Sequence, residues 1–215
     1  MFDKIFPKIH TEGYKFIIIS VFLTILFYFI STFLGLIFLI LTIWVYYFFR
    51  DPERISINDD DYLISPADGI VLQVKETTGP KEMGLENKNM TKISIFMNVF
   101  DCHVNRTPLS GKITDIKYIA GKFFNASLDK ASEDNERNYY KIQGSNGEEV
   151  VVVQIAGLIA RRIVCESSIN DELNQGDRIG MIRFGSRADL YFENYKPLVK
   201  VNQKTIAGET LLAKK

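Results

Sequence analysis

The sequence predicts a mostly β soluble domain, of the β-rich α+β class, that follows an N-terminal transmembrane helical hairpin. Residues 16–49 contain no Asp, Glu, Lys, Arg, His, Asn, Gln or Pro, a composition typical of a membrane segment. From residue 62 onward, short runs of β-branched residues alternate with glycines, as expected for strands joined by tight turns. The content of 13% aromatic and 47% hydrophobic residues excludes a disordered chain.

The apolar segment is too long for one upright helix. A helix over all of residues 16–49 would be about 50 Å long, whereas the hydrocarbon core of a bilayer is about 30 Å thick. Two short helices fit better, with a turn near Ser31, Thr32 and Gly35. A single tilted helix, with its ends on opposite sides of the membrane, is the alternative. Basic residues at both ends favour a hairpin with both ends in the cytoplasm: Lys4, Lys8 and Lys15 precede the segment, and Arg50 and Arg54 follow it.

Four segments are predicted along the chain. They are a cytoplasmic N-terminal segment 1–15, the membrane segment 16–49, a linker 50–61 that contains Pro52, and a β-rich domain 62–215. Residues 127–137 resemble a helix but are polar throughout, so a loop is the alternative there. Within the domain, apolar runs predict strands at 69–74, 92–99, 111–118, 139–142, 149–155, 161–165, 177–183 and 198–201.

Charge and cysteine content exclude several classes of function. The chain has 26 Lys+Arg and 26 Asp+Glu, and this balance argues against a nucleic-acid partner. Cys102 and Cys165 lie far apart, with no CxxC or Cys/His spacing. We therefore expect neither a disulfide framework nor a metal site. We also expect the protein to be in a reducing compartment.

Three short segments contain residues that could act in chemistry. His103 is the one imidazole of the predicted β-rich domain and the first candidate for proton transfer near neutral pH, although a histidine at a strand end can also be purely structural. Asp68 follows Pro66 in a turn-like Ser65–Gly69 segment, where it could only stabilise the turn. Gly185-Ser186 follows a predicted strand and by itself reads as a turn. It lacks the second glycine and the helix of a lipase-type nucleophile elbow.

Six short segments, taken together and in their order along the chain, identify a protein family far more specifically than any one of them does. With them, the chain resembles the short, membrane-anchored form, archaeal and bacterial, of phosphatidylserine decarboxylase, a pyruvoyl-dependent family. The segments are Phe48–Pro52, Ser65–Gly69, Phe100–Arg106, residues 121–137 with Asn125-Ala126 and Asn135–Arg137, Ala160–Ile163, and Arg183–Arg187.

The resemblance implies a proenzyme that cuts itself between Gly185 and Ser186. The Ser186 hydroxyl would attack the Gly185 carbonyl carbon, and β-elimination would then cleave the chain and leave a pyruvoyl group at residue 186. Glycine suits the position before the serine because it has no hindering side chain and tolerates strained backbone angles. The pyruvoyl ketone would form a Schiff base with the substrate amine and accept the electron pair released with CO2. The reaction would convert phosphatidylserine to phosphatidylethanolamine in phospholipid biosynthesis.

The resemblance leaves the base for self-cleavage open between Asp68, His103 or both. Long forms of the family have two histidines three residues apart, and this chain has His103 at the first position and Arg106 at the second. His103 is also expected to return a proton to the substrate carbon after decarboxylation. Arg187 and Arg106 are candidates to bind the substrate, Arg187 through the carboxylate or phosphate of the lipid.

The expected partners are phosphatidylserine in the membrane and the chain's own two fragments, 1–185 and 186–215, as a heterodimer; a higher oligomer is left open. The expected location is the cell membrane, with the β-rich domain on the cytoplasmic side. One alternative is decarboxylation of an archaeal ether lipid with the same headgroup, archaetidylserine. A different class is a non-catalytic, membrane-tethered hybrid-barrel β module, which would remain uncut. Residues 121–137 could contact substrate, close as a lid or form a solvated turn.

Overall fold

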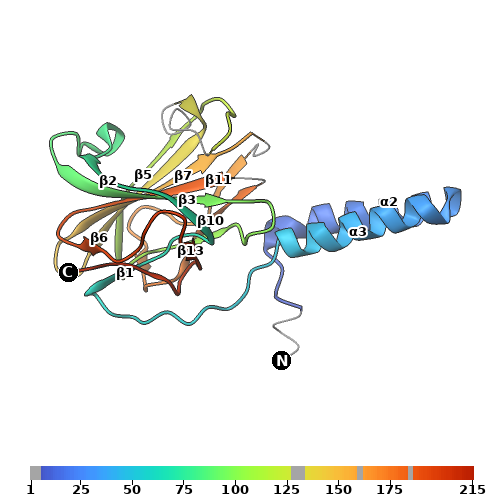
Figure 1. Cartoon of the computed structure of the whole chain (residues 1–215), viewed down its shortest axis with the longest axis horizontal. Coiled ribbons are helices and arrows are strands. Elements are labelled where there is room, and N and C mark those ends of the chain that lie inside the picture. The colour runs from blue at the N-terminus through green and yellow to red at the C-terminus, as the bar shows by residue number, and fades with distance from the viewer. Residues whose placement is uncertain (1–5, 127–133, 159–161, 184–185) are drawn as a thin grey trace. The chain divides into compact units, whose positions relative to one another are not determined.

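The computed structural model describes residues 6–126, 134–158, 162–183 and 186–215. The chain divides into two compact units, Met1–Glu53 and Arg54–Lys215 (Figure 1). Each unit is described by itself.

The first unit is a hairpin of two apolar helices, as predicted. A short 3-10 turn η1 (Thr11–Gly13) leads into α2 (Tyr14–Ile30), and α3 (Thr32–Phe48) follows after the extended residue Ser31. The stacked rings of Phe27 and Phe38, 4.2 Å between centroids, hold the helices together. The helical stretch Thr11–Ile30 is long and apolar enough to cross a membrane by length and composition, and α3 is shorter.

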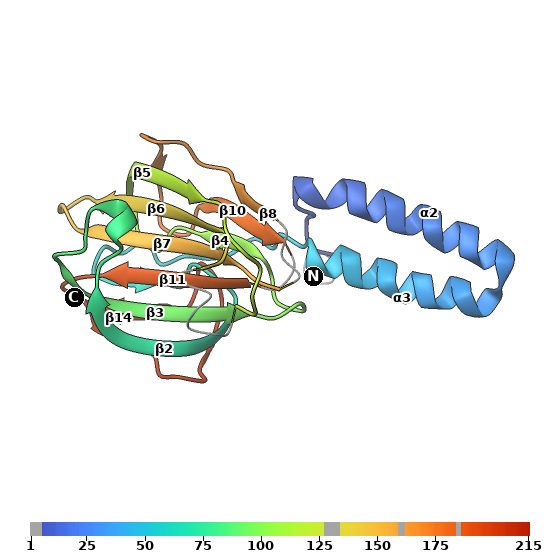
Figure 2. The same ribbon diagram turned by 90° about the horizontal axis from the view of Figure 1, so that it is seen from above.

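The second unit is built on an eight-stranded antiparallel sheet with the strand order β13-β2-β3-β11-β7-β6-β5-β9. Figure 2 shows β2, β3, β11, β7, β6 and β5 side by side in this order. Two three-stranded sheets, β1-β14-β12 and β4-β10-β8, accompany it. The elements are β1 (Tyr62–Ile64), β2 (Gly69–Thr78), η2 (Lys81–Met83), β3 (Asn89–Met97), β4 (Val104–Arg106), β5 (Gly111–Ile119), β6 (Arg137–Gly144), β7 (Glu149–Ala156), β8 (Arg162–Cys165), β9 (Glu172–Leu173), β10 (Arg178–Arg183), β11 (Ser186–Phe192), β12 (Lys196–Pro197), β13 (Lys204–Thr205) and β14 (Leu211–Lys214).

The large sheet buries apolar side chains on both faces, and the larger core lies on the inner face. There Ile95 of β3, Val152 of β7 and Leu190 of β11 pack in one cluster with Ile182 of β10 and Leu212 of β14, so this face is covered by the two smaller sheets. A smaller cluster around Met90, Tyr139 and Val153 covers part of the outer face. A mostly β domain that follows a helical hairpin is therefore confirmed.

The strand prediction was wrong at several places in the C-terminal quarter, where it missed, among others, the short strands β9, β12, β13 and β14. The structure has a central strand over Ser186–Phe192 that the sequence did not predict. Conversely, the predicted strand 198–201 is extended surface chain that leads into a turn at Asn202 (φ 70°). In the segment 127–137, residues 127–133 lie outside the described part of the chain, and Arg137 already belongs to strand β6.

Candidate active site

Ser186 is the first residue of β11 and is fully buried. It is paired in register with Met97 at the end of β3 and with Ala156 at the end of β7. Its Oγ donates a 3.3 Å hydrogen bond to the Met97 Sδ, and a thioether is only a weak acceptor. The hydroxyl is thus held inside the protein by a bond that is easily broken. Phe184 and Gly185 lie outside the described residues.

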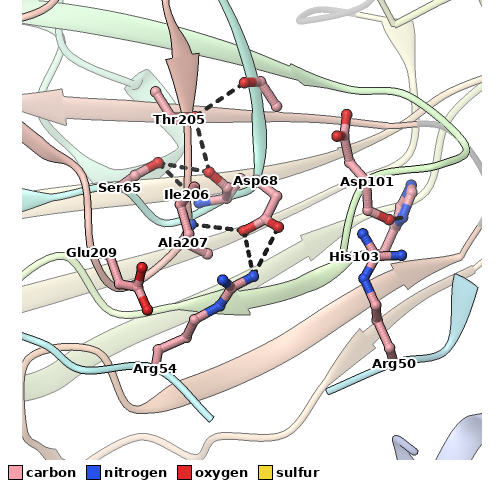
Figure 3. A network of polar contacts seen from close by, with 12 residues as sticks. Arg50, Arg54, Ser65, Asp68, Asp101, His103, Thr205, Ile206, Ala207 and Glu209 are labelled. Carbon is pink, nitrogen blue, oxygen red and sulfur yellow. Dashed lines mark hydrogen bonds and ion pairs between the residues drawn. The ribbon is translucent and has the colours of Figure 1, made fainter. Parts of the chain in front are cut away.

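The turn that contains Asp68 is fixed from several sides. The Ser65 hydroxyl and the Thr205 hydroxyl both donate to the Ala67 carbonyl, at 2.7 and 3.1 Å (Figure 3). Gly69 has a φ of 154°, and a Cβ there would collide with the Phe96 carbonyl oxygen. A glycine is therefore required for the turn to approach strand β3.

The Asp68 carboxylate is held by three hydrogen bonds (Figure 3). The Arg54 Nη2 lies 3.1 and 2.9 Å from its two oxygens, and the Ala207 backbone N–H donates to Oδ1 at 2.8 Å. Both partners of the ion pair are largely shielded from water. Sequence reasoning had placed Arg54 at the flank of the membrane segment only, because nothing local connects it to a residue fourteen positions away.

His103 is fully buried in the loop between β3 and β4. Its Nδ1 lies 3.0 Å from the Asp101 carbonyl oxygen (Figure 3). A carbonyl can only accept a hydrogen bond, so Nδ1 bears the proton in the neutral ring, and Nε2 is the basic nitrogen. The His103 carbonyl accepts a 3.3 Å bond from the Ile182 N–H on β10. His103 is therefore anchored beside the strand that leads, through Arg183, toward Ser186.

Asn105 connects these parts, and the sequence analysis did not single it out. Its side-chain Nδ2 donates to the Pro66 carbonyl at 3.2 Å and lies 3.7 Å from the Met97 Sδ, the same sulfur that Ser186 contacts. Its Oδ1 accepts a 3.0 Å bond from Gln154 Nε2, which fixes the orientation of the amide. One buried amide thus joins the Asp68 turn, the His103 segment and the surroundings of Ser186. The only sequence signal was its place between His103 and Arg106.

The two arginines proposed to bind substrate lie in different surroundings. The Arg106 N–H donates to the Pro66 carbonyl at 3.0 Å, and its Nη1 donates to the Gly176 carbonyl at 2.8 Å. Arg187 is fully buried and binds both carboxylate oxygens of Asp189, at 2.6 and 2.7 Å. Because side chains alternate along a strand, Arg187 projects from the face of β11 opposite to Ser186.

The outer face around Arg187 is a buried charged cluster. Lys92 Nζ lies 3.7 Å from Asp189, and Tyr139 and Tyr191 are close by. Burial raises the pKa of the Tyr139 hydroxyl to about 12, in spite of the nearby Arg137 charge. Both tyrosines therefore stay neutral and cannot serve as bases near neutral pH. In the described part of the chain, no three His, Cys, Asp or Glu side chains are grouped to hold a metal ion.

Asn135 and Glu136 are buried and hold the loops at this end of the sheet together. The Asn135 Nδ2 donates to the carbonyls of Phe124 and Ala156, at 2.8 and 2.7 Å. The Glu136 Oε1 accepts a 3.1 Å bond from the Ile163 N–H. These side chains tie residue 124 to the end of β7 directly beside Ser186.

Comparison with known proteins identifies the family. The family model for phosphatidylserine decarboxylase matches residues 41–213, which is most of the chain. The chain belongs to the phosphatidylserine decarboxylase family. It is 75% identical, over the full length of both chains, to the phosphatidylserine decarboxylase proenzyme of Pelagibacter ubique. It is 51% identical over 214 residues to the proenzyme of Ruegeria pomeroyi, covering 99% of this chain and 98% of that one. The proenzyme of Beijerinckia indica is 52% identical over 206 residues, 95% of this chain and 88% of its own.

In this member of the phosphatidylserine decarboxylase family, the motifs that suggested the resemblance converge in space. The Ser65–Gly69 turn, the His103–Arg106 segment and Ser186 are joined through Pro66, Asn105 and Met97. Arg187, although next to Ser186 in sequence, belongs to the separate cluster on the outer face. Gly185, the other residue of the predicted cleavage site, lies outside the described residues.

Proposed function

We propose that this chain is a proenzyme that cuts itself between Gly185 and Ser186 and then decarboxylates phosphatidylserine to phosphatidylethanolamine. The observation that carries the proposal is the buried Ser186 hydroxyl at the start of a central strand, connected through Met97 and Asn105 to the elements that contain Asp68 and His103. The names of the relatives, all of them proenzymes, support it.

The first step is the attack of the Ser186 Oγ on the carbonyl carbon of Gly185. The Oγ proton goes to the base and the new C–O bond forms. The base then returns this proton to the nitrogen of residue 186 as the peptide C–N bond breaks, so the amide becomes an ester and the nitrogen an amine. Loss of the Cα proton of residue 186 then expels Gly185 as a carboxylate and leaves dehydroalanine. Its hydrolysis releases ammonia and leaves the pyruvoyl ketone.

We assign the proton transfers of self-cleavage to His103. Its Nδ1–H is held by the Asp101 carbonyl, which leaves Nε2 as the basic nitrogen of the imidazole. The Asp68 oxygens, in contrast, are already engaged by Arg54 and the Ala207 N–H. We therefore assign to Asp68 the charge and the position of the turn, and not the removal of the proton.

The pyruvoyl group formed from Ser186 supplies a ketone that accepts the electron pair released when CO2 leaves. The same His103 Nε2, once protonated, is proposed to return a proton to the substrate carbon. Arg106, anchored to Gly176 beside the Asp68 turn, is proposed to contribute positive charge for the substrate anion. Arg187 is held in its ion pair with Asp189 and is assigned to positioning of β11.

The basic residues on both sides of the apolar hairpin indicate on which side of the membrane the second unit, Arg54–Lys215, lies. Lysines precede the apolar hairpin and Arg50 and Arg54 follow it, so we propose that both ends, and with them the catalytic unit, lie in the cytoplasm. Phosphatidylserine is then decarboxylated at the cytoplasmic surface of the membrane during phospholipid biosynthesis.

The test is intact-mass analysis of the full chain under denaturing conditions, for wild type, Ser186→Ala and Ser94→Ala. Ser94 is an equally buried serine on the neighbouring strand β3 and serves as the matched control. We expect wild type and Ser94→Ala to appear as fragments 1–185 and 186–215, the second with a ketone in place of its amine, and Ser186→Ala to stay whole. A wild-type chain that remains uncut and does not release CO2 from phosphatidylserine vesicles would support the non-catalytic β module instead.

The choice of base is tested separately with His103→Ala and Asp68→Asn. If His103 accepts the proton, His103→Ala abolishes cleavage, and added imidazole restores part of it. Asp68→Asn keeps the hydrogen bond from Ala207 and slows cleavage without abolishing it. Unchanged cleavage in His103→Ala would transfer the role to Asp68.

A further inference from the structure

Several loops leave the large sheet at the end where Ser186 lies. Strands β3 and β7 end at Met97 and Ala156, and both residues are paired with Ser186 at the start of β11. Strand β5 ends and β6 begins at the same end, because Ile119 is paired with Arg137 and Arg137 with Ile155. Figure 2 shows these strands side by side, with β3 and β11 running in opposite directions.

This end of the sheet exposes large apolar side chains from three loops or strand ends. We call them the apolar rim. Their exposed fractions are between 37% and 71%, and they are Phe100, Tyr118, Phe123, Phe124 and Leu158. The turn between β6 and β7 at the opposite end is polar by contrast, with the sequence Ser145-Asn146-Gly147-Glu148. Five exposed apolar side chains are thus gathered on the side of Ser186, whereas Ile169, Leu198 and Val201 are exposed elsewhere. A gathering of this kind marks an interaction surface.

A small apolar cavity of about 270 Å³ lies within this rim. It is lined by residues of all three loops, among them Val99, Ala126 and Leu158, and by Phe96 of β3. It lies toward the outer face of the sheet, because its Phe96 is paired with Arg187 and the carbonyl of its Ala126 accepts a 3.5 Å bond from Arg187 Nη1, and it extends to Gly157 just after β7. The cavity therefore opens among the rim residues, on the side of the sheet opposite to the Ser186 side chain.

The rim is a fixed surface with positive charge at its edge. The Asn135 side chain binds the backbone of Phe124 on both its N–H and its carbonyl, at 2.8 Å each, and also holds the Ala156 carbonyl. Lys122 Nζ lies 5.6 Å from the centre of the Phe124 ring, and Arg162 is exposed at the start of β8. Aromatic and aliphatic side chains bordered by cations suit the boundary between anionic headgroups and acyl chains.

We propose that the apolar rim docks on the surface of a phospholipid bilayer. A membrane is the occupant that the chain itself provides, because only residues 49–53 separate the apolar helix α3 from the catalytic unit. The consequence for the substrate rests on the proposed decarboxylase function, whereas the docking of the rim does not. The serine headgroup then reaches residue 186 while the lipid tails stay in the bilayer.

Fluorescence quenching in lipid nanodiscs tests the docking without reference to activity. Starting from a full-length Trp44→Phe chain, which has no other tryptophan, Phe100→Trp, Phe124→Trp and Leu158→Trp are made singly, and Asn146→Trp at the opposite end is the matched control. The discs contain phosphatidylglycerol and phosphatidylcholine with acyl chains brominated near the headgroup. We expect the rim tryptophans to be quenched several-fold more than Trp at position 146. Equal quenching at both ends would overturn the proposal.

An activity measurement tests the consequence for the substrate. The triple variant Phe100→Ser, Phe124→Ser, Leu158→Ser is compared with Ile169→Ser, an exposed apolar residue near the start of β5. Self-cleavage by intact mass shows that each variant folds. We expect the triple variant to lose decarboxylation of bilayer phosphatidylserine several-fold and to keep its rate on a monomeric short-chain phosphatidylserine. Equal losses on both substrates would contradict the docking role, and inactivity of wild type on both with quenching intact would refute the proposed function alone.

Discussion

Arg54 contacts the candidate site although it lies outside the motifs that suggested the site. It closes over the Asp68 carboxylate with bonds to both oxygens, and the same turn supplies Pro66 O to Asn105. Its guanidinium therefore helps to set where the Asp68 turn meets the His103 segment. Lysine could supply the charge but not the fixed planar geometry.

Removal of this ion pair is expected to slow self-cleavage. In Arg54→Ala the Asp68 turn loses an anchor, and because small misplacements of reacting groups are costly, we expect cleavage about 10- to 100-fold slower. Arg54→Lys should recover part of the rate, and the melting temperature should change little between the two variants. The measurement is the time course of the 1–185 and 186–215 fragments by intact mass. Equal rates for Arg54→Ala and wild type would show that Asp68 is positioned without it.

The Arg187–Asp189 pair is a stability element within a strand. Both side chains are buried to at least 99%, so loss of one charge leaves the other without compensation in a medium of low polarity. We expect Asp189→Asn to destabilise the domain by about 3–5 kcal/mol, which lowers the melting temperature by about 10 °C in a domain of this size.

The control for this prediction is Glu53→Gln, which removes the exposed Lys8–Glu53 pair, with 77% and 66% of its side chains accessible. Such pairs contribute about 1 kcal/mol or less. Thermal unfolding followed by the β signal in circular dichroism measures both variants. If the melting temperature falls no further for Asp189→Asn than for Glu53→Gln, Arg187 must have found another partner or become hydrated.

At the scale of elements, β11 is the strand that organises the site. It lies between β3 and β7 in the centre of the large sheet, and its first residue is Ser186. Its sequence did not predict a strand because Arg187 and Asp189 interrupt the apolar pattern. In the fold these two side chains neutralise each other on the outer face, while Ala188 and Leu190 enter the inner core.

The far ends of the central strands are joined by an acid-sensitive network. Lys88 binds Glu149 at 2.7 Å and Glu193 at 3.1 Å, and Lys141 binds Glu149 at 3.0 Å. The hydrogen bond from Lys88 is the main reason that the pKa of Glu149 lies below its usual 4.5, although partial burial opposes it. Because the folded-state pKa is depressed, the stabilisation is present above pH 4.5 and is lost as the pH falls through the folded-state value.

We therefore expect Glu149→Gln to lower the melting temperature near pH 7 and to have little further effect once the pH is below the folded-state pKa. The measurement is thermal unfolding by circular dichroism from about pH 7 to about pH 3. The control is Glu86→Gln, at an exposed position, for which the melting temperature as a function of pH should stay close to that of wild type. If the melting temperatures of Glu149→Gln and wild type differ by the same amount over the whole pH range, the ionisation of Glu149 is not the cause of the difference.

At the scale of the whole molecule, the proposed cut falls inside the sheet and not between domains. Residues 186–215 contain three strands that pair with the longer fragment: β11 with β3 and β7, β13 with β2, and β14 with β1. The fourth strand, β12, pairs with β14. Residues of the short fragment such as Leu190, Phe192 and Leu212 are part of the main core. Cleavage thus releases the backbone at residue 186 without releasing the strand.

The fragments 1–185 and 186–215 are therefore expected to remain together after cleavage. In mild detergent they should elute from a size-exclusion column at the volume of the uncut Ser186→Ala chain, and they should separate in a denaturing gel. The buried strand contacts are the physical reason, because separation would expose both the core and two rows of backbone hydrogen-bonding groups. If the short fragment 186–215 is missing from the size-exclusion peak of the native protein, the two fragments do not remain together after cleavage.

The sequence was sufficient for those features that depend on local composition and on motifs. The helical hairpin followed from the charge-free run 16–49, and most strands from short β-branched runs such as 149–155, which the structure has at Glu149–Ala156. Ser186, His103 and Asp68 were candidates from their motifs. Local pattern failed where a strand had charges that are neutralised only across space, at Arg187 and Asp189, and where apolar residues such as Leu198 and Val201 stay exposed.

The sequence by itself determined the two-part organisation, the β class and the residues of the candidate site, because hydropathy and short motifs are local properties of the chain. Only the tertiary structure decided that Arg54 holds Asp68, that Asn105 links the Asp68 turn to Ser186, that Arg187 faces away from the site, and that apolar loops gather around Ser186. These relations depend on strand register and on contacts between residues far apart in sequence, which arise only when the sheet closes around its core.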